Sequence, residues 1–148
     1  MHIPGSHEYF MQKALQEAQN AFDEEEVPVG AIVVMNNKII ARAYNQTEKL
    51  TDATAHAEML AITSATNAIG AKFLPEATLY VTLEPCPMCA GAIYWSRIGT
   101  VVYGASDAKS GYNRFYKEQE LHPKTIIIKG IMEAECSKLM VDFFKQKR

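Results

Sequence analysis

Two short segments of the 148-residue chain carry residue types that bind metals and move protons. One is His56-Ala57-Glu58 and the other is Pro85-Cys86-Pro87-Met88-Cys89. Two cysteine thiolates and one imidazole suit zinc, and three protein ligands leave the fourth tetrahedral position open for water, whereas closed structural sites use four. The pattern therefore predicts a catalytic zinc site held by His56, Cys86 and Cys89, with Glu58 beside it as an acid–base group.

Helix geometry restricts how these side chains reach one site. Residues two apart on a regular helix, such as His56 and Glu58, point about 200° away from each other. They can serve one site only at a helix N-terminus, where first-turn side chains converge. Cys86 and Cys89 share one face of a first turn, where the helix dipole lowers thiol pKa values and favours thiolates. We therefore expect both segments at helix starts, on the sheet edge where binding sites gather.

Hydrophobic spacing predicts the elements that position these segments. Helices are expected over residues 7–24, 54–69, from 85 or 86 to about 97, and in the last stretch, where 132–144 place apolar residues on one face. Strands are expected over 29–35, 38–44, 78–83, 100–105 and 125–128. Ser6 is a predicted N-cap, Gly70 a predicted helix end, and Asn36-Asn37 a tight hairpin turn. This order predicts an α/β fold, a three-layer α/β/α sandwich around a five-stranded mixed sheet.

Composition is that of an ordinary globular protein, with 48% hydrophobic residues and a formal net charge of −2. We expect one domain over 1–148, with 1–6 disordered or an added tail. No apolar run approaches the roughly 20 residues that span a bilayer, and no secretory segment is present, so a cytoplasmic protein is expected. The charge argues against broad nucleic-acid binding but leaves room for a local patch. The third cysteine of the chain, Cys136, is expected in the core.

The order H-x-E and then P-C-x-x-C resembles the signature of zinc nucleobase deaminases. On this basis the chain is similar to the cytidine deaminase-like superfamily. Within it, the chain most resembles the bacterial tRNA-specific adenosine deaminases, which convert adenosine to inosine at the anticodon wobble position. The closer match lies in residues 26–31, 54–58, 78–86, 88–92, 96–99 and 103–109.

This resemblance implies the role of each site residue. It implies one Zn²⁺ per subunit on His56, Cys86 and Cys89, with Glu58 as the proton shuttle. It further implies that Asn45 hydrogen-bonds the base and that Asp107 approaches neighbouring nucleotides. The remaining pocket walls are implied at Val29, Leu83 and the backbone of Ala57. A tRNA anticodon stem-loop is the implied substrate and a homodimer the implied assembly.

Some segments depart from this pattern and keep other functions open. Residues 111–124 are shorter than, and unlike, the corresponding region of typical bacterial members, and the acidic run 23–26 would repel phosphate if it faced RNA. Residues 89–95 resemble the guanine deaminase branch of the superfamily. A free-base or nucleoside deaminase, guanine first, is therefore the main alternative. A non-catalytic zinc-containing RNA-binding subunit is the alternative from another class of protein.

Several of these residues also have ordinary structural interpretations. Asn45 suits a turn after a strand, Asp107 suits a cap of the following turn, and Tyr94 and Trp95 suit a core or an interface. Basic residues form two groups, which are either solvated surface or the arms of an RNA groove. The groups are Lys109, Arg114 and Lys117, and Lys145, Lys147 and Arg148; Tyr112, Phe115 or Tyr116 would stack on unpaired bases in such a groove.

Overall fold

The computed structural model describes residues 2–116 and 121–147. Its strands are β1 (Gly30–Met35), β2 (Lys38–Tyr44), β3 (Thr78–Leu83), β4 (Thr100–Ala105) and β5 (Ile126–Lys129). Its helices are α1 (His7–Asp23), α2 (Ala57–Ile69), α3 (Pro87–Ser96), α4 (Tyr112–Tyr116) and α5 (Glu133–Gln146). None of the helices in these described ranges is long and apolar enough to cross a membrane.

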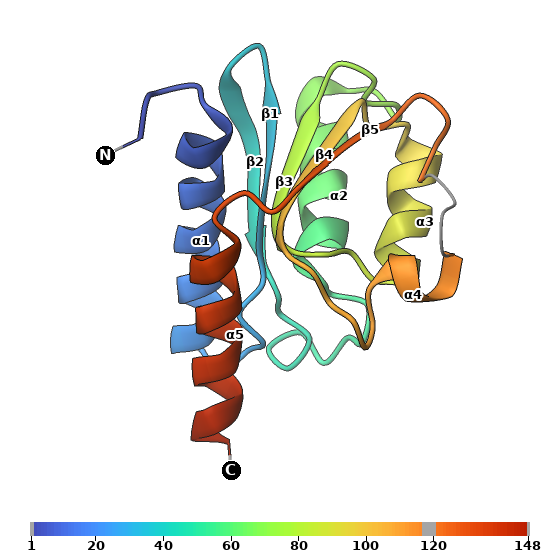
Figure 1. Cartoon of the computed structure of the whole chain (residues 1–148). Coiled ribbons are helices and arrows are strands. Elements are labelled where there is room, and N and C mark those ends of the chain that lie inside the picture. The colour runs from blue at the N-terminus through green and yellow to red at the C-terminus, as the bar shows by residue number, and fades with distance from the viewer. Residues whose placement is uncertain (1, 117–120, 148) are drawn as a thin grey trace.

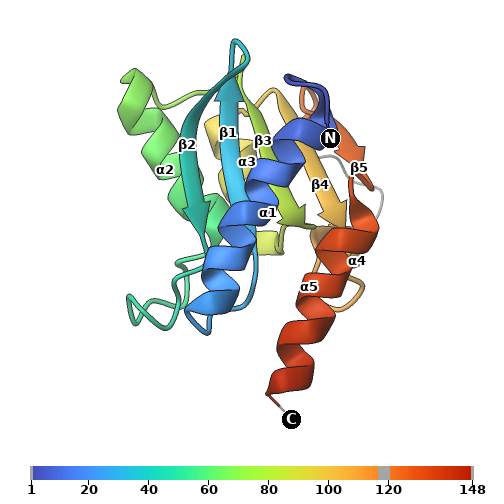
Figure 2. The ribbon, with the colours of Figure 1, turned by 90° about the vertical axis from the view of Figure 1, so that its left-hand side faces the viewer.

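The strands form one five-stranded mixed sheet in the order β2-β1-β3-β4-β5. Strand β1 is antiparallel to both β2 and β3, whereas β3, β4 and β5 are parallel. Helices α1 and α5 cover one face of the sheet, and α2 and α3 cover the other, as Figures 1 and 2 show. The predicted three-layer α/β/α sandwich is confirmed.

Alternation along the strands explains this layering. In β1, Ala31 and Val33 join the core beneath α2 and α3, whereas Ile32 and Val34 join the core beneath α1. Because both faces of the central strands are buried, their sequences are continuous apolar runs rather than alternating ones. Cys136 of α5 is 2% exposed in the second core, as predicted.

The predicted turns and caps are found where the sequence places them. The Ser6 hydroxyl accepts the Tyr9 N–H at 3.1 Å and caps α1. Asn36 and Asn37 both have positive φ, at 53° and 60°, which is the backbone of a two-residue hairpin. Gly70 ends α2 with φ 69°.

Two helices begin later than their periodicity predicts. Helix α2 starts at Ala57 rather than Thr54, because the Asp52 carboxylate accepts the Thr54 N–H and hydroxyl and holds that segment in a turn. Helix α3 starts at Pro87, since proline lacks an N–H and suits a first helical position. The predicted strand 125–128 shifts by one residue to Ile126–Lys129. Helix α5 extends two residues past 144, to Gln146, and the remaining boundaries differ by at most one residue.

One edge of the sheet gathers the loops that matter for function. The parallel strands β3 and β4 both end there. The antiparallel pairing of Gly30 with Tyr44 brings the start of β1 and the end of β2 to the same edge. Helices α2 and α3 begin at this edge, so residues far apart in the sequence meet there.

Close approach of α1 to β1 depends on Gly30. A Cβ at this position would overlap the backbone of Ala14 and Ala18 in α1. Gly30→Ala should therefore lower the free energy of unfolding by at least about 3 kcal/mol, because two backbone segments must separate. Gly91→Ala in α3 is the control, since nothing lies within 4 Å of its added Cβ. Urea unfolding of both variants tests the expectation, and equal stabilities would contradict it.

Candidate active site

The N-termini of α2 and α3 face each other and bring together the predicted metal ligands. His56 is the N-cap of α2 and Cys86 is the N-cap of α3, both with extended backbone. The Nδ1 atom of His56 lies 3.6 Å from the Sγ atoms of Cys86 and of Cys89. These three ligand atoms lie within 4.8 Å of one another. Two segments that are about thirty positions apart along the chain thus form one cluster.

This donor set fits a tetrahedral zinc ion. Typical Zn–S and Zn–N distances of about 2.3 and 2.0 Å place nitrogen and sulfur roughly 3.5 Å apart on a tetrahedron. The 3.6 Å separations around His56 Nδ1 agree with that geometry. Within the described residues, no other histidine, cysteine or carboxylate joins the group, which leaves one position of a tetrahedron open.

A shared proton links the two thiols. A hydrogen bond from the Cys89 thiol lowers the pKa of Cys86 to about 4. The same hydrogen bond, together with burial, raises the pKa of Cys89, and hydrogen bonding to Cys86 raises the pKa of His56. Without a cation, these pKa shifts favour one thiolate and one thiol, and the two zinc-bound thiolates expected from the sequence stay a prediction. A cation in place of this proton would make both sulfurs ligands.

Glu58 lies beside the cluster as the second residue of α2. Its side chain is only 4% exposed, and burial raises the pKa of this carboxyl group to about 7. A carboxyl group that titrates near neutral pH can both accept and donate a proton under physiological conditions. The geometric requirement that His56 and Glu58 share a helix N-terminus is met.

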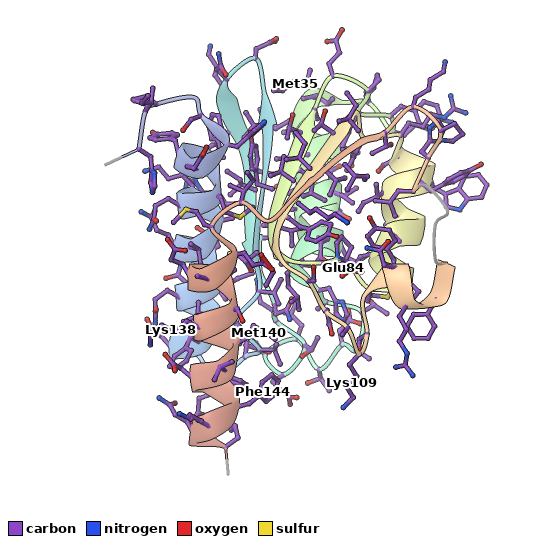
Figure 3. All side chains as sticks on the ribbon, in the orientation of Figure 1. Met35, Glu84, Lys109, Lys138, Met140 and Phe144 are labelled. Carbon is purple, nitrogen blue, oxygen red and sulfur yellow. The ribbon has the colours of Figure 1, made fainter. Side chains whose placement is uncertain are left out.

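A cavity of about 800 Å³ opens in front of this cluster. His56, Glu58 and Cys86 form its floor, and Lys109 of the loop after β4 lies at its rim. Met140 and Phe144 line it from α5, on the side opposite that loop (Figure 3). The sequence does not predict these α5 contacts, because apolar spacing identifies the helix but not what it covers.

Three of the predicted base contacts line the cavity directly, namely Asn45, Val29 and Leu83. Asn45 is 8% exposed, and its Oδ1 accepts the Ala57 N–H at 2.8 Å. Because Oδ1 takes that N–H, the amide nitrogen of Asn45 is left as a donor. Ala57 is fully buried and contributes its backbone N–H, which orients Asn45.

Asp107 lines the cavity and also caps a turn. One carboxylate oxygen accepts the N–H groups of Lys109 and Ser110, at 3.2 and 3.0 Å. The capping interpretation of Asp107 is therefore confirmed, and its position at the cavity leaves the substrate contact a prediction.

Two buried glutamates that the sequence does not single out organise loops beside the cavity. Glu26 is 1% exposed and accepts the N–H groups of Glu48 and Lys49. Its charge faces protein amides, so the acidic run 23–26 presents fewer charges to a ligand than its sequence indicates. Glu84 is 5% exposed and accepts the N–H groups of Asp107 and Asn113. Position alone could have pointed to Glu84, since it directly follows β3.

The aromatic and basic residues that the sequence assigns to an RNA groove, a core or an interface differ in their exposure to solvent. Tyr112 is 4% exposed, because its ring packs edge-on against Tyr103 in the core, so the prediction that it stacks on bases is wrong. Phe115 is exposed, and Trp95 and Tyr94 are 76% and 43% exposed, which excludes a core role for these two. Lys109, Arg114, Lys145 and Lys147 are exposed, whereas Lys117, Arg148 and the Tyr116 side chain lie outside the described residues.

Comparisons with known proteins agree on the kind of enzyme. Residues 5–148 match the MafB19-like deaminase family. A tRNA-specific adenosine deaminase of Agrobacterium fabrum is 44% identical over 144 residues, which are 95% of each chain. A solved structure from studies of A-to-I editing by tRNA:A34 deaminases at the wobble position of transfer RNA is 44% identical. It has a TM-score of 0.82 and covers 88% of this chain and 98% of its own.

A guanine deaminase of Bacillus subtilis is also similar. Its structure is 38% identical to this chain, has a TM-score of 0.68, and covers 76% of each chain. The likeness to a guanine deaminase expected from residues 89–95 is therefore present alongside the stronger likeness to tRNA deaminases.

The raised pKa of Glu58 makes a prediction for the stability of the metal-free protein. Between pH 4.5, the ordinary pKa, and about 7, the folded state holds a proton that the unfolded state has lost. The free energy of unfolding should therefore fall as pH rises through this window, by up to about 3 kcal/mol. Glu58→Gln should lack this component. Urea unfolding of both proteins at pH 5 and 8 measures the difference, and the same pH dependence in both would contradict the assignment.

Proposed function

The chain belongs to the family of tRNA-specific adenosine deaminases, and we propose that it hydrolyses adenosine to inosine at the wobble position of a tRNA anticodon loop. One observation carries this proposal: near-full-length identity of 44% to a tRNA-specific adenosine deaminase accompanies a buried glutamate beside a three-ligand cluster. The reaction forms a C–O bond at C6 of adenine, breaks the exocyclic C–N bond, and releases ammonia.

Three residues would hold one Zn²⁺ per chain, namely His56 through Nδ1 and Cys86 and Cys89 through Sγ. When bound, zinc lowers the pKa of a water molecule towards 7 and so supplies hydroxide at neutral pH. The chemistry of the donor set supports this choice, because thiolate and imidazole ligands in a tetrahedral arrangement suit zinc.

Glu58 moves the protons of the reaction. It takes a proton from the attacking water and delivers it to the adjacent ring nitrogen. It then takes the proton of the hydroxyl formed at C6 and delivers it to the departing amino group, which leaves as ammonia. Its burial supports this role, because a pKa of about 7 lets the carboxylate form accept and the acid form donate. The glutamate is not a metal ligand, so it stays free to cycle between the two forms.

Base recognition falls to the cavity walls. The amide nitrogen of Asn45 donates a hydrogen bond to an acceptor on the base, because Ala57 fixes Oδ1 in the opposite direction. Val29 and Leu83 pack on the faces of the ring. Anticodon-loop bases are already partly unstacked, which lowers the cost of flipping one into the cavity. Asp107 and Lys109 approach the nucleotides on either side.

The assembly is a homodimer in this proposal. Exposed Tyr94 and Trp95 on α3 support it, because large apolar side chains that cluster on a surface mark protein interfaces. We also propose a cytoplasmic location, and its only support is the proposed tRNA substrate. The main alternative substrate is a free base, guanine first, which the 38% identity to a guanine deaminase supports.

Removal of Glu58 tests the chemistry and the substrate together. Glu58→Ala should lower ammonia release from an anticodon stem-loop bearing A34 by a factor of about 10² to 10⁴, because general acid–base catalysis is lost. Zinc, measured by elemental analysis, should stay at one ion per chain. The wild type is compared on free guanine, cytosine and adenosine.

Each substrate outcome has a definite meaning. Turnover of the stem-loop alone, lost in the variant, supports RNA editing. Turnover of guanine alone assigns the protein to the small-molecule branch. Unchanged biological activity in Glu58→Ala would support the non-catalytic RNA-binding subunit instead.

Substitution of Asn45 tests base recognition separately. Asn45→Asp keeps an acceptor for the Ala57 N–H but replaces the amide donor with an oxygen. The KM for the stem-loop should rise by a factor of about 10 to 100, the effect of losing one well-placed hydrogen bond beside a desolvated base. Zinc content should match the wild type. An unchanged KM would mean that the Asn45 amide nitrogen makes no contact with the base.

A further inference from the structure

The loop between β4 and α4, residues 106–111, lies at the cavity mouth, and the Glu84 carboxylate connects it to the end of β3. Glu84 directly follows β3, and its Oε1 accepts the Asp107 N–H at 3.0 Å. Its Oε2 accepts the Asn113 N–H, also at 3.0 Å. The two N–H groups stand at the start of the loop and just beyond its end, so a single side chain fixes both sides of it. Figure 3 shows Glu84 near the loop that carries Lys109.

The partners of the Glu84 carboxylate are backbone N–H groups and not a charged side chain. Its side chain is 5% exposed, and among the described residues neither salt bridge of the chain involves it. A buried carboxylate needs hydrogen-bond donors, and the backbone of this loop supplies them. Two backbone hydrogen bonds join the same segments. The Glu84 N–H donates to the Ala105 carbonyl and the Tyr112 N–H donates to the Pro85 carbonyl, each at 2.8 Å.

Gly111 is adapted to the same contact. A Cβ at this position would overlap both the Glu84 carboxylate and the backbone carbonyl of Asp107, so the loop can close on the glutamate only if position 111 lacks a side chain. The φ of Gly111 is not among the positive values of the chain, so its backbone also suits alanine. An alanine here should therefore displace the loop from Glu84 and from the Asp107 carbonyl without imposing an unfavourable φ.

This anchoring sets the position of side chains that face a ligand. Asp107, Lys109 and Ser110 line the cavity from the loop. Glu84 lines it as well, but both of its carboxylate oxygens are engaged by backbone amides. We propose that Glu84 is a positioning residue that holds the 106–111 loop at the cavity mouth and so sets the affinity for nucleotides that flank the deaminated base. This inference rests on the proposed RNA substrate, but the anchoring itself does not.

Glu26 offers a matched control on the other side of the cavity. It is equally buried and accepts the N–H groups of Glu48 and Lys49, at 3.1 and 2.8 Å. Thr47 of that loop lines the cavity as well. The chain therefore contains two buried glutamates of the same chemistry that hold two different loops.

Amide hydrogen exchange tests the anchoring without any substrate. In Glu84→Gln, one of the two acceptor oxygens becomes an amide donor, so exchange at Asp107 or at Asn113 should speed up at least about tenfold, with Glu48 and Lys49 unchanged. Glu26→Gln should give the reverse pattern. Faster exchange at all four amides in both variants would indicate general destabilisation and would overturn the specific role of Glu84, as would unchanged exchange at Asp107 and Asn113.

Kinetics on the zinc-loaded enzyme test the functional part. Glu84→Gln should raise the KM for the A34 stem-loop about tenfold or more, with kcat within about twofold and one zinc per chain. Gly111→Ala should give the same direction of change, and it serves if Glu84→Gln does not fold. A lower kcat with unchanged KM, or loss of zinc, would overturn the positioning role, because Glu84 would then act on the metal site.

If the proposed RNA substrate is wrong, the kinetic and the exchange experiments give results that can be told apart from a failure of the Glu84 anchoring. A wild type that deaminates only a free base would remove the RNA substrate and with it the flanking nucleotides. The exchange pattern would still decide whether Glu84 anchors the loop.

Discussion

The site depends on the requirement that two helix N-termini meet over one sheet edge. His56 and Cys86 are N-cap residues, so their side chains project beyond the ends of α2 and α3 rather than along the helix sides. Residues two apart then reach a common point, which the side of a regular helix does not allow. The antiparallel start of the sheet adds Val29 and Asn45 to the same edge. Metal ligands, acid–base group and base contacts thus follow from a single topological arrangement.

Three buried glutamates show how one residue type serves different ends in this fold. Glu26 and Glu84 each accept two backbone N–H groups from a loop, so burial of their charge is offset and the loops are fixed. Burial dominates at Glu58, and it raises the pKa of that carboxyl group to about 7.

Local signals of the sequence predict most of this architecture. Apolar runs mark the strands, Asn36-Asn37 marks the hairpin, and the spacing of Cys86 and Cys89 marks a metal site, because each depends on neighbours within a few residues. Packing between distant elements is not predicted in this way. Tyr112 is buried because its ring packs against Tyr103, and Met140 lines the cavity from α5, which packs against β4. Neither contact leaves a local pattern. The burial of Glu84 likewise depends on amides that lie more than twenty positions further along the chain.

The separation between floor and rim of the cavity has a consequence for how such enzymes diverge. The floor is formed at the N-termini of α2 and α3, whereas the rim is formed by the loop after β4 and by α5. Mutations that reshape the rim can therefore accumulate while the reactive centre stays intact. A lineage built on this plan can acquire a new substrate through drift in two peripheral segments, and it does not have to evolve its chemistry a second time.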